Sequence, residues 1–169
     1  MNGQEFIARA IETGSVFDFS IGGKLALVEK KITLDYIEEI QGRRGARTLR
    51  RDYGLFEATF GDESEWVCRS IILELHRLAS MPDLADKIRE LTGVDLAPYT
   101  AWTDVEDELQ RLASRQPFDP STVTQEYRTY RSRKTGATVH VIDDPSSERG
   151  VYPGYGDVWS LDIVDPKFL

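Results

Sequence analysis

The stretch LRRDYGLFEATFGDESEWVCRSIILELHR at residues 49–77 decides the fold, because it predicts three short strands joined by tight turns. A second stretch, EYRTYRSRKTGATVHVIDDPSSERGVYPGYGDVWSLDIV at residues 126–164, predicts three more strands. A helical stretch precedes the first set, and helical stretches at 82–92 and 103–115 precede the second. We therefore expect an α+β fold, in which two helix–three-strand meander units form an antiparallel sheet with helices packed on one face.

The 169 residues suit a single domain, and the repeated pattern divides it into two structural half-repeats, 1–80 and 81–169. Between the first helices and the first meander, TLDYIEEI at 33–40 fits either another helical turn or a strand, and QGRRGAR at 41–47 predicts a polar loop. In the last strand, the alternation predicts that Trp159, Leu161 and Ile163 point inward.

The charge of the chain is acidic, with 21 Lys and Arg against 29 Asp and Glu and a net charge of −8. Most of this excess falls in the second half-repeat. An acidic surface repels nucleic-acid phosphates and anionic lipids and attracts basic partners. We therefore expect no nucleic-acid binding, no membrane binding, and a protein partner with a basic surface.

The compartment is predicted from the cysteine count and the N-terminus. Cys68 is the single cysteine, so the chain has no internal disulfide. The first residues, MNGQEFIARAIETG, predict an amphipathic helix and not a secretory signal, and no apolar run reaches the length of a membrane span. We expect a cytoplasmic protein.

No catalytic signature stands out in the sequence. The two histidines, His76 and His140, have no cysteine or histidine at metal-ligand spacing, so neither a metal nor a cofactor is predicted. Gly22-Gly23-Lys24 lacks the rest of a phosphate-binding loop, and no serine lies in a nucleophile elbow. We predict no catalytic residues and a protein that is not an enzyme.

Aromatic and acidic side chains are the candidate binding groups. Tyrosine and tryptophan often anchor protein interfaces, because they bury a large rigid area and keep a polar tip. The acidic run after Trp102 complements the positive end of a helix dipole, and it also offers a docking patch for a basic partner. The predicted partner-binding residues are Trp66, Trp102, Asp104, Glu106, Asp107, Tyr127, Tyr130, Asp143, Asp144, Tyr152 and Tyr155.

A resemblance supports this interpretation. The segments IGGKLALVEKKI, LRRDYGLFEATF and WVCRSIILELHRL resemble small actinobacterial immunity-like proteins of polymorphic toxin systems. The repeated helix–meander layout is also similar to that of the β-lactamase inhibitor protein family, whose tandem halves present a concave sheet to an enzyme. That family is disulfide-linked, unlike this chain. The resemblance implies an acidic, aromatic-bearing face that binds a protein, and it implies no catalytic residue.

Three functions follow as hypotheses. The first is a non-enzymatic protein-binding protein of the immunity or inhibitor type, which occludes a basic site on a toxin or enzyme. The second is a small-ligand-binding module or enzyme that uses a cavity between helices and sheet, with His140, Asp143 and Asp144 as its polar groups. The third is a homodimer formed through an edge or a face of the sheet.

Overall fold

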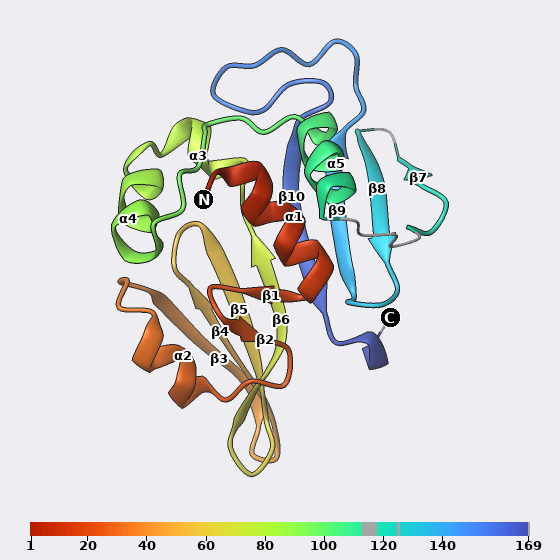
Figure 1. Cartoon of the computed structure of the whole chain (residues 1–169). Coiled ribbons are helices and arrows are strands. Elements are labelled where there is room, and N and C mark those ends of the chain that lie inside the picture. Colours follow the sequence, from red (N-terminus) through yellow and green to blue (C-terminus); the bar gives the residue numbers. More distant parts are fainter. Residues whose placement is uncertain (113–117, 125, 169) are drawn as a thin grey trace.

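The computed structural model describes residues 1–112, 118–124 and 126–168, and its centre is an eight-stranded antiparallel sheet (Figure 1). The strand order is β3-β4-β5-β6-β10-β9-β8-β7. The strands are β3 (Ile37–Arg43), β4 (Ala46–Asp52), β5 (Phe56–Asp62), β6 (Trp66–Leu73), β7 (Thr122–Val123), β8 (Tyr127–Ser132), β9 (Ala137–Ile142) and β10 (Val158–Val164).

Each half of the chain contributes a meander, and the two meanders meet where their last strands pair. In this β6–β10 ladder, Leu73 lies opposite Leu161 and Ile71 lies opposite Ile163. All four side chains are fully buried. The seam between the halves is therefore part of the hydrophobic core.

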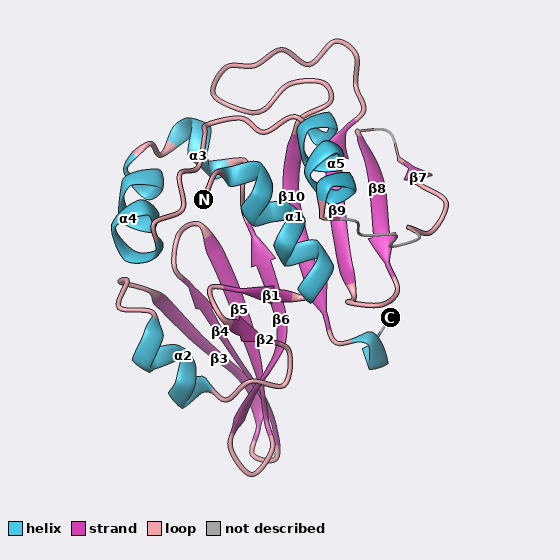
Figure 2. Ribbon diagram, viewed as in Figure 1, coloured by secondary structure: helices cyan, strands magenta, loops and turns pink. Residues whose placement is uncertain are grey.

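The helices lie on one face of the sheet, where α1 and α5 cross in front of the strands (Figure 2). A small two-stranded sheet packs on the same side. These elements are α1 (Gly3–Thr13), β1 (Ser15–Val16), β2 (Phe19–Ser20), α2 (Leu25–Lys31), α3 (Arg77–Ser80), α4 (Asp83–Thr92), α5 (Trp102–Arg111) and a final 3-10 turn, η1 (Pro166–Phe168).

Two adjacent rows of side chains show which face of the sheet is covered. Residues directly opposite one another in an antiparallel ladder share a face. One row crosses five strands through Phe56, Leu73, Leu161, Val139 and Tyr130, and it packs into the core beneath the helices. The neighbouring row therefore points to the other side, which we call the open face. That row consists of Asp52, Glu57, Ile72, Asp162, Thr138 and Arg131.

The predicted α+β class, antiparallel sheet and one-sided helices are confirmed. The count of three strands per unit is too low, because the two-residue β7 adds a fourth strand to the second half and β3 adds one to the first. Residues 37–40 of the ambiguous stretch 33–40 belong to β3, and the predicted polar loop 41–47 is the β3–β4 hairpin. The missed strand has every side chain exposed, so it lacks the alternation of apolar and polar residues by which strands are recognised. Residues 113–115 of the predicted helix 103–115 lie outside the described part.

The prediction that Trp159 points inward with Leu161 and Ile163 is wrong, because the pairing of β10 with β9 shifts between Val158 and Ser160. An extra residue at such a bulge reverses the phase of alternation along the strand. Leu161 and Ile163 are buried as predicted, whereas Trp159 is only half-buried and lies on the open face. A bulge in the β5–β6 pairing has a similar effect and puts Cys68 in the core.

Candidate functional site

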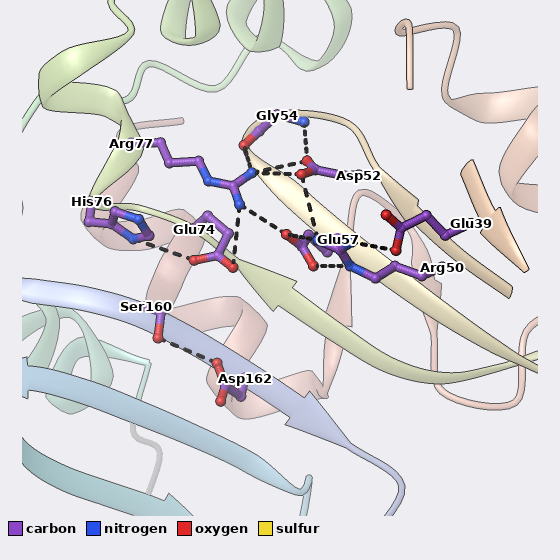
Figure 3. Close-up of polar contacts among 10 residues, drawn as sticks. All are labelled: Glu39, Arg50, Asp52, Gly54, Glu57, Glu74, His76, Arg77, Ser160 and Asp162. Carbon is purple, nitrogen blue, oxygen red and sulfur yellow. Dashed lines mark hydrogen bonds and ion pairs between the residues drawn. The ribbon is translucent and has the colours of Figure 1, made fainter. Parts of the chain in front are cut away.

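The open face carries a network of ion pairs that we call the carboxylate–arginine cluster: Glu39, Arg50, Asp52, Glu57, Glu74 and Arg77 (Figure 3). Arg50 donates to both oxygens of Glu57, with Nε–Oε2 at 2.6 Å and Nη2–Oε1 at 2.8 Å. Arg77 reaches the same carboxylate at 2.9 Å and also donates to Asp52 and to the carbonyl of Gly54. Glu57 thus joins β4, β5 and the start of α3.

Glu57 is 8% exposed, and its hydrogen bonds from Arg50 and Arg77 hold its pKa below the usual 4.5. We expect Glu57→Gln to lower the free energy of unfolding by about 2 kcal/mol at neutral pH, because hydrogen bonds to a charged group are lost. Since the folded-state pKa is lowered, this stability is present above about pH 4.5 and is lost as the pH falls through the folded-state value.

Urea denaturation of the wild type and of Glu57→Gln at pH 7 and about pH 3 measures this effect. The difference between their free energies of unfolding should narrow in acid. The exposed Glu90→Gln on α4 is the matched control, which removes a carboxylate outside the cluster. An equal difference in free energy of unfolding at both pH values would show that the charge of Glu57 does not stabilise the fold.

Glu74 is the least compensated carboxylate of the cluster. It directly follows β6, and burial raises its pKa, to which the neighbouring carboxylates of Glu57 and Asp162 add. Its nearest cationic atom is Arg77 Nη2 at 3.8 Å, beyond hydrogen-bond distance. A further positive group near Glu74 would therefore be electrostatically favoured.

Beside Glu74 lies a second group, the aromatic cluster, which consists of His76, Tyr127, His140, Tyr152 and Trp159. The rings of His76 and Trp159 stack at 4.1 Å with an interplanar angle of 2°. The rings of Tyr127 and Tyr152 each lie 5.8 Å from that of Trp159. His140 packs edge-on to Tyr127 and bonds to Asp162 through Nε2 at 3.1 Å. Residues from the β6–α3 connection, β8, β9, the β9–β10 loop and β10 thus form one aromatic surface.

The polar atoms of His76 are only partly satisfied. Burial and the nearby charge of Arg77 lower its pKa, which favours the neutral imidazole. Its Nδ1 is buried and has no hydrogen-bond partner among the described residues, although Glu74 Oε2 lies 3.4 Å away. His76 therefore links the two clusters without completing the hydrogen bonding of either.

The aromatic cluster borders two shallow hollows in the open face. One has a volume of about 420 Å³ and is lined by Thr124, Tyr127, Thr129, His140, Trp159 and Ser160. The other has a volume of about 240 Å³, and Tyr127, Tyr152 and Trp159 contribute to its lining. The arrangement can receive side chains that protrude from a partner.

The loop that carries Tyr152 is tied down by Asp157. The Asp157 carboxylate is 1% exposed and accepts two hydrogen bonds from Arg149, at 2.6 and 2.8 Å, and a third from the amide of Gly154. Across the loop, Asp144 accepts hydrogen bonds from the amide and hydroxyl of Ser146. These contacts brace both ends of the loop.

Several predicted partner-binding residues belong to this site or border it. Tyr127 lies on β8 in the aromatic cluster, and Tyr152 joins it with 57% of its surface exposed. Asp144 lines the smaller hollow. Tyr155 is also 57% exposed, but no aromatic ring contact joins it to the cluster in the described residues.

Three predicted aromatic anchors, Trp66, Trp102 and Tyr130, lie on the helix-covered face and not in the aromatic cluster. Trp102 is 4% exposed and stacks on Tyr130 at 4.5 Å. Trp66 is half-buried, packs against the core and has Arg47 above its ring at 5.2 Å. Packing into or against the hydrophobic core explains all three positions.

The remaining predicted residues are separated from the aromatic cluster. Asp104, Glu106 and Asp107 lie on α5, the helix that covers the opposite side of the sheet. Asp143 pairs with Arg128 at 3.2 Å. The acidic run on α5 is therefore not continuous with the open face.

The rival ligand site is not assembled as predicted. His140 pairs with Asp162, Asp143 with Arg128, and Asp144 with its own turn. In the described ranges, no group of three or more His, Cys, Asp or Glu side chains is arranged to hold a metal ion. No helix there is long and apolar enough to cross a membrane.

Sequence reasoning missed the residues that dominate the site, namely Glu57, Glu74, His76, Arg77, Trp159 and Asp162. One available signal was the polar Glu57 and Thr59 alternating with apolar residues in FEATF, which marks a solvent-facing side of the strand. The partners of these residues depend on ladder register, which the local sequence does not reveal.

We compared the chain with known proteins. The search found no matching family model, no significant match among curated proteins and no significant match among solved structures. The open face and its two clusters are therefore the features of this chain that bear on its function.

Proposed function

We propose that this chain is a non-enzymatic protein-binding protein of the immunity or inhibitor type, whose open face occludes a basic site on a toxin or enzyme. The observation that carries the proposal is the aromatic cluster on the uncovered side of the sheet, bordered by carboxylates. Aromatic anchors surrounded by polar groups are typical of the energetic centre of a protein interface.

Charge supports a basic partner. Among the residues drawn in Figure 3, Glu39, Asp52, Glu57, Glu74 and Asp162 provide five carboxylates against the two guanidinium groups of Arg50 and Arg77. A lysine or arginine of the partner would meet Glu74 and Asp162 beside the ring of Trp159. There it would gain both ion pairing and a cation–π contact.

A cytoplasmic location is part of the same proposal. The only cysteine is buried, and burial raises the pKa of its thiol to about 12, so Cys68 stays protonated at neutral pH. A single unreactive thiol suits a reducing compartment.

The test is capture of a partner from the native host, with the products of neighbouring genes included, followed by affinity measurement with purified protein. Tyr152→Ala should weaken the complex at least about tenfold, because an interface tyrosine often contributes more than 1.4 kcal/mol. Tyr155→Ala is the matched control, since both tyrosines are 57% exposed and lie in one loop. It should leave the affinity within about twofold.

Equal effects of the two substitutions would contradict the aromatic cluster as the anchor. Failure to recover any stoichiometric partner would count against protein binding itself. Isothermal titration calorimetry in low and high salt adds a further criterion, because a basic partner should bind more weakly as salt rises.

A second candidate function, small-ligand binding, is favoured by one cavity on the helix side. Its volume is about 600 Å³, within the usual range for ligand pockets. Its lining combines apolar side chains, including Phe6, Phe17 and Ile32, with the charged Arg9 and Lys31. Screening metabolites for an increase in melting temperature tests it, and Phe17→Ala should abolish any increase that arises at this cavity.

A further inference from the structure

Strand β3 forms one edge of the eight-stranded sheet, and its exposure is unusual. All seven of its residues are exposed on both faces. Ile37 is 69% exposed and Ile40 is 52% exposed. The opposite edge, β7, has only two residues. The sheet therefore ends on one side in a long strand with apolar side chains in solvent.

The inner side of β3 is fully paired, whereas its outer side is available. Seven consecutive residues of β3 lie opposite seven of β4, and among the described strands only β4 neighbours it. An edge strand presents unpaired N–H and C=O groups along its outer side, and such a row is a template for another strand. Natural edges are usually protected by charge or by short length.

The charges of β3 do not provide that protection. Glu38 binds Arg51 at 2.7 Å, and Glu39 binds Arg50 at 3.1 Å, so both carboxylates are held by β4. Neutralised in this way, they present little repulsion to an incoming strand. The edge is thus long, partly apolar and electrically compensated.

We propose that β3 pairs with β3 of a second copy of this chain, in an antiparallel ladder centred on Ile40. In this register Ile40 faces Ile40, Glu39 faces Gln41, and Ile37 faces Arg43. No like charges lie opposite each other, whereas a ladder centred on Glu39 would oppose two carboxylates and be destabilised. The self-complementarity of the sequence around Ile40 is the reason for choosing a second copy over another partner.

The geometry of such a dimer has a direct consequence for the open face. The two-fold axis of an antiparallel strand pair runs perpendicular to the sheet, so equivalent residues of both copies emerge on the same side. The dimer would be one continuous sheet with helices on one side and both open faces on the other. This inference does not depend on the proposed partner, because it concerns the edge and not the face.

Sedimentation velocity over a range of protein concentrations tests the proposal with the full chain alone. The wild type should shift from monomer to dimer as concentration rises. Ile40→Lys should raise the dimer dissociation constant at least about tenfold, because it removes an apolar pair and opposes two ammonium groups. Val123→Lys on β7 is the matched control, since Val123 is 54% exposed at the other edge. It should leave the constant unchanged.

A cross-linking experiment checks the register. Ile40→Cys should form a covalent dimer on mild oxidation, and Val123→Cys should not, because the native Cys68 is buried. A wild type that remains monomeric at all concentrations would overturn the proposal. A dimer that Ile40→Lys does not weaken, with circular dichroism unchanged, would also overturn it. If the chain dimerises but no partner is captured from the native host, the proposed function is contradicted and the dimer is not.

Discussion

Phe56→Ala is expected to lower the free energy of unfolding by about 4 kcal/mol, within the usual range for removal of a fully buried phenylalanine. Phe56 is 0% exposed and lies opposite Leu73 in the β5–β6 ladder. Its ring contacts those of Phe17, Phe19 and Tyr53 at centroid distances of 5.4, 5.9 and 4.6 Å. The substitution would leave a cavity where the small sheet, the large sheet and the helices meet.

Urea denaturation followed by circular dichroism measures this loss. Val123→Ala is the control, because Val123 is also an apolar strand residue but is 54% exposed on β7, and it should change stability by less than about 0.5 kcal/mol. A loss below about 1 kcal/mol for Phe56→Ala would mean that the aromatic packing around β5 contributes little to the core.

Trp102→Ala is expected to lower the free energy of unfolding by about 3 kcal/mol, because Trp102 is the first residue of α5 and packs this helix against the sheet. Its indole stacks on Tyr130 and meets Phe118 edge-on at 5.9 Å. Tyr152→Ala should change stability by less than about 0.5 kcal/mol, since that ring is mostly in solvent. The sequence predicted the same binding role for both aromatic residues. The structure instead predicts a large loss of stability for Trp102→Ala and a small change for Tyr152→Ala.

Thermal and urea unfolding of both variants, with near-ultraviolet circular dichroism to follow aromatic packing, separates these outcomes. If Trp102→Ala left stability unchanged and weakened partner capture, the assignment of Trp102 to the core would be contradicted.

The sequence was sufficient to predict the class of fold because the signals for it are local. Alternation in FEATF and in ATVHVI, with turns between the runs, predicts antiparallel strands without knowledge of distant contacts. β3 escaped detection because an edge strand exposed on both faces has no apolar side to reveal its period. The strand was defined by its hydrogen bonds to β4 and not by its own pattern.

The site was harder to predict because it depends on register. Whether Glu57 meets Arg50 and Arg77 is determined by ladders between segments 7 to 20 positions apart. One bulge before Ser160 is enough to turn Trp159 from the predicted core to the open face. Residue type alone also cannot separate Tyr127 from Tyr130, which lie on the same strand but face opposite sides.

Asp157 braces the 143–157 loop, so the loop loses its conformational entropy during folding and not when a partner binds. Because Arg149 and Gly154 already hold the loop in the folded chain, ordering of the segment that carries Tyr152 is completed during folding. A partner would then meet a preorganised surface and lose little affinity to loop ordering. Substitutions at the exposed positions Val151 and Tyr152 would change the contact surface without releasing the anchors. The loop backbone is thus held in place while its exposed side chains can change. Partner preference can therefore evolve at those positions without a change of fold.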